Sequence, residues 1–363
     1  MNYSEYLFQS ISRALNKNRR DKQALEIYAN GPALGSYKGK VRPENEDRVT
    51  IVTFPPTKER PALFLAALCD GLGGMQAGAE CARDSLAYLI STMASSQWTN
   101  VQQFLRDSIL SSNQLLNKKY VNKSGSTLSA VLFTASGEVS AYNVGDSRIY
   151  SYGPSGIKQI SSDDTLEKFL KRSHDANDIH PQLGQRLAQS MGMASIQLED
   201  LVLPSTDSQL GLFLSSDGAH DINHETLASL ASAAVSPLEF VDHLLTLHSW
   251  SAARDNSSLV CLPLGEWLVA LGKFWVADVI RLFTSYNEVF IQLPSPSQAI
   301  TQASTELKED AARLPLLKKK GDGDLFSDSS TFTPRKKPAD AKKQGRKPAR
   351  PGKKKKPFLK VIQ

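Results

Sequence analysis

Residues 63–74 read LFLAALCDGLGG, a continuous apolar run that ends in an Asp-Gly pair and a cluster of glycines. A short apolar run bounded by turn residues is typical of a buried β-strand. Asp70 stands at the end of that strand, and the helical spacing of Ala82, Leu86 and Leu89 predicts a helix after the glycines. The stretch therefore predicts a strand, a tight turn and a helix around one carboxylate.

The glycine cluster does not fit the two common phosphate-binding loops. A P-loop needs Lys and Ser or Thr after its last glycine, where this chain has Ala79 and Glu80. The dinucleotide fingerprint would begin at Gly71 and Gly73, but its third glycine is replaced by Gln76. A carboxylate followed by a glycine carbonyl suits a hard divalent cation, although a single Asp-Gly pair is more often only a turn.

Other strands and helices come in runs along the chain. We expect further strands over 33–41, 48–54, 127–134, 138–145, 147–153, 211–216 and 258–264, and helices over 79–93, 101–116 and 238–248. The three strands between 127 and 153 are expected to form one antiparallel meander. Runs of strands and runs of helices, without strict alternation, indicate an α+β layered domain.

Four segments are predicted: a helical lead over 1–31, a domain over 32–264, an amphipathic helical extension over 265–293, and a basic tail over 294–363. The tail is rich in Lys and Pro, so we expect it to be disordered. From Pro315 to Gln363 it has 16 Lys and Arg against 4 Asp, a balance of +12 that leaves −6 for the rest of the chain. Such a tail could bind an acidic partner, nucleic acid or an anionic membrane face, or serve only to keep the protein soluble.

Several classes of protein are excluded by composition. No apolar run reaches the roughly 18 to 20 residues of a membrane-spanning helix, and the first residues lack the pattern of a secretory signal. The three cysteines, Cys69, Cys81 and Cys261, form no CxxC pair, which argues against a zinc ribbon or a disulfide framework. We expect a cytoplasmic protein with reduced thiols.

Acidic residues recur at the ends of the predicted strands. Asp70 and Asp217 each follow an apolar strand and precede a glycine. Neighbouring carboxylates at the rim of a core repel each other, and a bound metal ion would compensate for their charge. Few histidines are near, so oxygen-rich Mg²⁺ or Mn²⁺ coordination is favoured over zinc. The further acids in this setting are Glu46 and Asp47 in VRPENEDRV, Asp146 in NVGDSR and Asp255 in ARDNSS.

At this point the sequence resembles a known family. The motifs RPENED, CDGLGG, GST, NVGDSR, SSDGAHD and ARDN occur in the order typical of the metal-dependent (PPM, type 2C) Ser/Thr protein phosphatases, over about 33–264. Leu72, after Asp70-Gly71, resembles the bacterial branch. The resemblance implies an α+β fold, a four-layer α-β-β-α sandwich of two antiparallel sheets flanked by helices, with two Mn²⁺ or Mg²⁺ ions at one edge.

The resemblance also implies a role for each matching residue. Arg42 and Asp70 are expected to be catalytic, with Arg42 binding phosphate and Asp70 bridging both metal ions. Asn256 is expected to support the site from behind the ligands. A third, weaker metal is expected on Asp146 together with Asp217. The full expected ligand set is Glu46, Asp47, Asp70, Gly71, Asp146, Asp217 and Asp255.

The implied reaction is hydrolysis of phospho-Ser or phospho-Thr by water that two metal ions activate. Leu72 cannot donate the proton that the leaving oxygen needs. We expect a metal-bound water in that role, with His220 as the alternative. Residues 161–200 are expected to form a flap beside the site, in which Asp163 or Asp164 could add a metal ligand.

Two further functions remain open. A PPM-fold protein could be a non-catalytic scaffold or a phosphoprotein-binding regulator with a basic tail, but such proteins usually lack metal ligands, and here every expected position holds one. A nucleic-acid-binding module rests on the tail alone. We therefore expect an enzyme that acts on phosphoproteins, opposing a Ser/Thr kinase.

Overall fold

The fold is taken from a computed structural model. It describes residues 3–16, 22–72, 77–154, 156–168, 186–204, 211–251, 254–265 and 275–293. The predicted tail over 294–363 lies outside these residues, as do 266–274 of the predicted extension. No helix among the described residues is long and apolar enough to cross a membrane.

The described strands form two antiparallel sheets of six strands each. In spatial order, the first sheet contains β1 (Lys22–Glu26), β2 (Ala33–Tyr37), β10 (Ser257–Pro263), β9 (Gly211–Ser215), β7 (Arg148–Gly153) and β8 (Gly156–Gln159). The second contains β12 (Glu288–Gln292), β11 (Val279–Phe283), β3 (Arg48–Phe54), β4 (Leu63–Cys69), β5 (Leu128–Thr134) and β6 (Val139–Val144).

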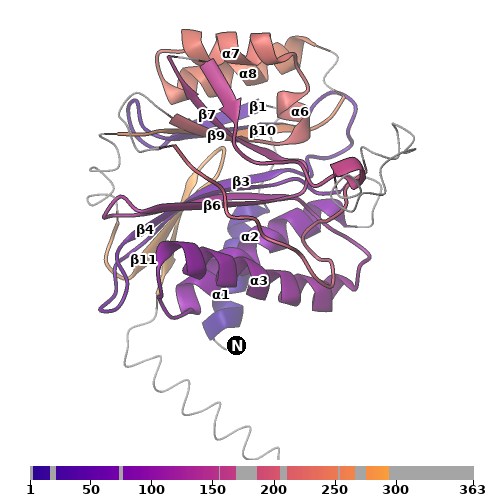
Figure 1. The fold of residues 1–363 in the computed structure, drawn as a ribbon. Coiled ribbons are helices and arrows are strands. Elements are labelled where there is room, and N and C mark those ends of the chain that lie inside the picture. Colours follow the sequence, from indigo (N-terminus) through magenta and orange to yellow (C-terminus); the bar gives the residue numbers. More distant parts are fainter. Residues whose placement is uncertain are drawn as a thin grey trace, which may run out of the picture. The chain divides into compact units, whose positions relative to one another are not determined.

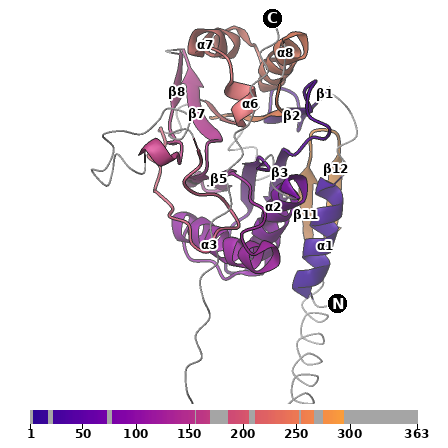
Figure 2. The ribbon, with the colours of Figure 1, turned by 90° about the vertical axis from the view of Figure 1, so that its right-hand side faces the viewer.

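Helices cover the outer face of each sheet. The second sheet is covered by α1 (Tyr3–Leu15), α2 (Gly78–Ser95) and α3 (Val101–Tyr120), and the first by α6 (Asp217–His220), α7 (His224–Ala233) and α8 (Pro237–Trp250). Figures 1 and 2 show the resulting helix, sheet, sheet and helix layers. The predicted four-layer α-β-β-α sandwich is confirmed.

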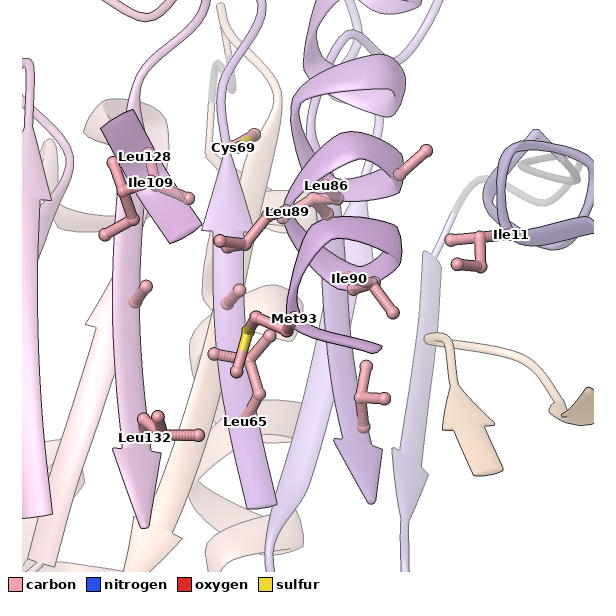
Figure 3. Close-up of a cluster of buried hydrophobic side chains, with 14 of the residues drawn as sticks. Ile11, Leu65, Cys69, Leu86, Leu89, Ile90, Met93, Ile109, Leu128 and Leu132 are labelled. Atoms are coloured by element: carbon pink, nitrogen blue, oxygen red, sulfur yellow. The ribbon is translucent and has the colours of Figure 1, made fainter. Parts of the chain in front are cut away.

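Each pair of adjacent layers encloses its own hydrophobic core. One core lies between the two sheets and contains Ile51, Phe64 and Leu214. Another joins the first sheet to α7 and α8. The third joins the second sheet to α1, α2 and α3, where side chains such as Leu86 and Ile90 point at the strands (Figure 3). The central strands are buried on both faces, which explains why β4 reads as a continuous apolar run.

The helix boundaries follow the capping residues. Asn100 accepts a hydrogen bond from the Gln103 amide at the start of α3. Ser236 caps α8 in the same way, and Pro237 occupies its first turn. The predicted strands and helices between 33 and 264 are present, but the meander is wrong in one respect: β5 and β6 pair, whereas β7 belongs to the other sheet.

Two predicted boundaries are also wrong. The lead over 1–31 is helical only in α1, and β1 pairs with β2 at the edge of the first sheet. The extension over 265–293 is not helical in its described part, because 279–292 form the hairpin β11–β12 and β11 pairs with β3. Ile280 and Leu282 are buried, while Arg281 lies on the other face of the strand. This alternation is typical of a strand, but it is too short here to be told from a helical pattern in the sequence. Both segments are therefore parts of the sandwich.

Candidate active site

The predicted acidic residues gather because strand ends from both sheets meet at one edge. In the second sheet Arg48 pairs with Cys69, so Asp47 and Asp70 are neighbours just beyond the paired strands. In the first sheet Ser215 pairs with both Leu259 and Arg148. That register brings the ends that carry Asp217, Asp255 and Asp146 to the same edge. Residues that are far apart in the sequence thus form one group.

Arg42 lies among these acids and bridges two of them. Its Nη2 atom is 2.6 Å from Oδ2 of Asp255, and its Nη1 atom is 3.3 Å from Oε2 of Glu46. The hydrogen bond that it donates to Asp255 and the charges of Asp255, Glu46 and Asp70 raise the pKa of the guanidinium, which therefore stays charged. Its side chain is 32% exposed, so the fork can also be reached from solvent.

Burial and mutual repulsion raise the pKa of several of the carboxyl groups. Burial, followed by the charges of Asp47 and Asp217, raises the pKa of Asp70 well above its usual value. Burial and the charge of Asp255 raise the pKa of Asp217. Burial raises the pKa of Asp146 to about 6, with the charge of Asp217 adding to the effect. The group thus needs positive charge to ionise fully.

Asp47 is the most enclosed member of the group. It is 1% exposed, and burial raises its pKa to about 7. Its Oδ2 atom accepts a hydrogen bond of 2.9 Å from the Ser216 hydroxyl. Its Oδ1 atom is buried and accepts no hydrogen bond from any described residue. A buried carboxylate oxygen without a donor is free to bind a cation.

Glycines make the close approaches in the site possible. A Cβ atom on Gly218 would lie 2.0 Å from the carbonyl oxygen of Asn256, so only glycine lets the start of α6 lie against the loop that carries Asp255. A Cβ on Gly71 would lie 2.5 Å from the carbonyl of Gly78. The glycine after each strand-end Asp is thus required by packing, and neither has a positive φ.

Asn256 joins the two loops that carry Arg42 and Asp255. It is 2% exposed, and its amide nitrogen donates to the carbonyl of Lys38 at 2.6 Å. Its Oδ1 atom accepts from the backbone amide of Glu46 at 2.8 Å. These contacts hold the two loops together, and the supporting role of Asn256 behind metal ligands stays a prediction.

The remaining predicted residues lie around this group. Leu72 follows the Asp-Gly turn, and its amide donates to the carbonyl of Gly125. Asp163 forms a salt bridge with Arg148, in which the Nη2 atom of Arg148 lies 2.7 Å from the Oδ2 atom of Asp163. Asp164 accepts a hydrogen bond from the amide of Gly145, next to Asp146. The part of the predicted flap over 169–185 lies outside the described residues.

Ser216 and Thr127 are residues of the site that the sequence reasoning missed. The Thr127 hydroxyl accepts a hydrogen bond from the backbone amide of Asp70 at 2.9 Å, and it is 2.7 Å from the hydroxyl of Ser147. A hydroxyl beside an acidic motif is too common in sequences to reveal such a role. The only available signals were the positions of Thr127 in GST and of Ser216 directly before Asp217.

The acids are not arranged as a ready metal cage. No group of three or more His, Cys, Asp or Glu side chains in the described part of the chain already has the arrangement to hold a metal ion. Two of the acids, Glu46 and Asp255, instead form ion pairs with Arg42. The donor set itself, carboxylate and carbonyl oxygens, is that of Mg²⁺ or Mn²⁺.

Comparison with known proteins gives one consistent class. The Serine/threonine phosphatase stp of Listeria monocytogenes is 29% identical over 244 residues, which cover 61% of this chain and 91% of that protein. The PPM Ser-Thr phosphatase MsPP from Mycobacterium smegmatis, solved with cacodylate, is 21% identical with a TM-score of 0.52, covering 64% of this chain and 98% of that one. The catalytic domain of the phosphatase PstP, solved with two manganese ions, is 22% identical with a TM-score of 0.52, covering 68% of this chain and 100% of that one. No family model matches the sequence.

The sandwich, the carboxylate group at its edge and these relatives agree with one another. The chain is similar in sequence to bacterial Ser/Thr phosphatases and shares its fold with PPM-type Ser/Thr phosphatases.

Proposed function

We propose that this chain removes phosphate from phospho-Ser and phospho-Thr in proteins, with two Mn²⁺ or Mg²⁺ ions as cofactors. The observation that carries the proposal is one guanidinium, Arg42, set among six carboxyl groups at one edge of the sandwich. Its relatives include a phosphatase solved with two manganese ions. The Listeria relative is named as a Ser/Thr phosphatase.

The residues present fit a divalent metal pair. Asp47 has a buried oxygen that accepts no hydrogen bond from the described residues. The pKa of Asp70 is raised by burial and then by the charges of Asp47 and Asp217, a repulsion that cations would offset. We assign Glu46, Asp47, Asp70, the carbonyl of Gly71, Asp217 and Asp255 as the residues that would hold the pair, and Asp146 with Asp217 as those that would hold a third, weaker ion. When bound, such ions supply Lewis acidity and lower the pKa of water toward neutrality.

Arg42 has the geometry to bind and orient the phosphate group. Two of its five N–H groups donate to Asp255 and Glu46, which fix the plane of the guanidinium. The other N–H groups belong to the same planar fork, which matches two phosphate oxygens in a way that a Lys ammonium does not. Arg42 thus holds the phosphate beside the carboxylates and offsets its charge.

The donor of the proton to the leaving Ser or Thr oxygen is not a side chain at position 72, because Leu72 has no dissociable proton. His220 donates or accepts a hydrogen bond of 3.0 Å with the Ser215 hydroxyl, and burial lowers its pKa to about 3. A group with that pKa is neutral and a weak proton donor at pH 7. A water that the metal ions would hold therefore stays the predicted proton source.

The test is hydrolysis of p-nitrophenyl phosphate and of a phosphothreonine peptide by the full-length protein with and without Mn²⁺. Turnover should require Mn²⁺, and Asp70→Asn should lower kcat/KM by more than about 100-fold, since even residues behind metal ligands cost about 10- to 100-fold. Asp107→Asn is the matched control, because Asp107 is exposed on α3. Absence of turnover by the wild type above the Asp70→Asn level would refute the proposal.

The natural phosphoprotein and an opposing kinase stay predictions, as do the cytoplasmic location and the contacts of the basic tail. Phosphoproteomics of a deletion strain would name the first two.

A further inference from the structure

The segment 124–127, which contains the GST motif, lies between the Asp-Gly turn and the end of the flap. On one side the amide of Thr127 donates to the carbonyl of Asp70 at 2.8 Å, and the amide of Leu72 donates to the carbonyl of Gly125 at 3.1 Å. On the other side Ser126 and Met191 exchange hydrogen bonds of 2.8 and 3.3 Å. Gly71, Ser126 and Met191 are thus consecutive members of a small antiparallel ladder.

The fit between these three segments is tight. A Cβ atom on Gly125 would lie 2.9 Å from Leu72 Cδ1, 2.9 Å from Ser190 Oγ and 3.2 Å from the carbonyl oxygen of Met191. Gly192 has a φ of +97°, and a Cβ there would lie 3.0 Å from the carbonyl oxygen of Ser124. The 190–193 segment is therefore packed closely against the segment 124–127, which is hydrogen-bonded to the backbone of Asp70 and Leu72.

Asn113 of α3 fixes the 190–193 segment from behind. It is 3% exposed; its Oδ1 atom accepts from the amide of Gly192 at 2.7 Å, and its Nδ2 atom donates to the carbonyl of Met193 at 2.9 Å. Asn117, one turn later, donates to the carbonyl of Gly192 at 2.8 Å. The Asn113 amide thus pairs with this backbone as a neighbouring strand would, and loss of the amide would leave buried polar groups without partners.

We propose that Asn113 is a positioning residue of the active site, which acts through Gly192, Met191 and Ser126 on the backbone of Gly71 and Asp70. The inference rests on the proposed function for its consequence, which is metal binding and catalysis. Its structural part, the coupling of α3 to the Asp-Gly turn, is independent of that function. The proposal gives α3 a role in the site although none of the predicted ligands lies on that helix.

The test compares Asn113→Leu, which loses both hydrogen bonds, with Asn113→Asp, which keeps the acceptor for the Gly192 amide. The matched control is Ile109→Val, a conservative change at a fully buried position one turn earlier in α3. Amide hydrogen-exchange rates are measured in the full-length protein without added metal, for peptides that contain Leu72 and Ser126. Calorimetric titration with Mn²⁺ measures the affinity for the metal, and kcat and KM are measured separately.

We expect Asn113→Leu to speed exchange at Leu72 and Ser126 and to weaken Mn²⁺ binding by about 10- to 100-fold, the range seen for residues that support metal ligands. Asn113→Asp should lie between this variant and the wild type, and Ile109→Val should match the wild type in both measurements. If Asn113→Leu does not fold, the comparison of Asn113→Asp with the wild type still tests the proposal.

Faster exchange confined to Gly192 and its neighbours, with Leu72, Ser126 and Mn²⁺ affinity as in Ile109→Val, would show that Asn113 only stabilises the fold. If the wild type binds no Mn²⁺, the proposed function fails. In that case the hydrogen-exchange rates at Leu72 and Ser126 still test whether Asn113 is coupled to the Asp-Gly turn.

Discussion

His220 illustrates at the scale of one residue how a motif position can mislead. It lies in SSDGAHD, three residues after Asp217, but its ring contacts the Ser215 hydroxyl and the edge of Tyr150. The groups whose charges act on its pKa are Arg148, Asp163 and His248. Of these, only Asp163 is a candidate ligand, from the predicted flap. These surroundings indicate a structural side chain beside the site.

His220→Ala should therefore keep most of the phosphatase activity at pH 7 to 8. A loss of no more than a few-fold in kcat with p-nitrophenyl phosphate is expected, because the residue is neutral and bonded to Ser215. A loss of several hundredfold, with the protein still folded by circular dichroism, would instead make His220 the proton donor.

The stability of the protein should also depend on this histidine. Burial lowers the pKa of His220 to about 3, whereas an unfolded histidine titrates near 6.5. The unfolded chain binds more protons between these values, so the stabilisation is present above about pH 6.5 and is lost as the pH falls toward 3. For one group this amounts to about 2 kcal/mol between pH 7 and pH 5.

Urea unfolding of the metal-free wild type and of His220→Asn at these two pH values measures that difference. On acidification the free energy of unfolding should fall less in the variant than in the wild type. The carboxyl groups are the same in both proteins, so their contribution cancels when the two falls are compared. Equal losses in the two proteins would contradict the assignment.

At the scale of elements, the hairpin β11–β12 shows where sequence periodicity is ambiguous. The run up to Phe283 satisfies a helical pattern, yet β3 offers a strand edge, and β11 pairs with it at Arg281, Leu282 and Phe283. Backbone groups at a strand edge need partners, so a nearby apolar segment is drawn into the sheet. The same competition places β1 beside β2.

Ile280→Ala tests whether this hairpin is part of the folded domain. Ile280 is fully buried in the core with α1, α2 and α3, so the change should lower the free energy of unfolding by about 2–5 kcal/mol. Denaturant titration measures it, with Val276→Ala as the control because Val276 is 43% exposed. Similar small effects of both changes would mean that the hairpin folds apart from the sandwich.

At the scale of the whole molecule, the site gathers carboxyl groups from both sheets at one edge, where they repel one another. Ligands that bind only the folded state raise its stability, by about 2.7 kcal/mol at a concentration 100 times the dissociation constant. Mn²⁺ should therefore raise the Tm of the wild type by several degrees, and chelation should reverse the effect. Asp70→Asn should show little shift, and an equal shift in both proteins would mean that the ions bind elsewhere.

The sequence by itself determined the layered α+β class, most strands and helices between 33 and 264, and the acids that the fold brings together. It could do so because buried strands leave continuous apolar runs and because Asp-Gly pairs at strand ends are visible locally. Tertiary structure alone decided which sheet β7 joins, that β1 and β11 complete the sheets, and how Arg42, Asn256 and Asn113 are placed. These features depend on strand pairing and hydrogen bonds between residues far apart in the chain, and the local periodicity of the sequence does not identify such partners.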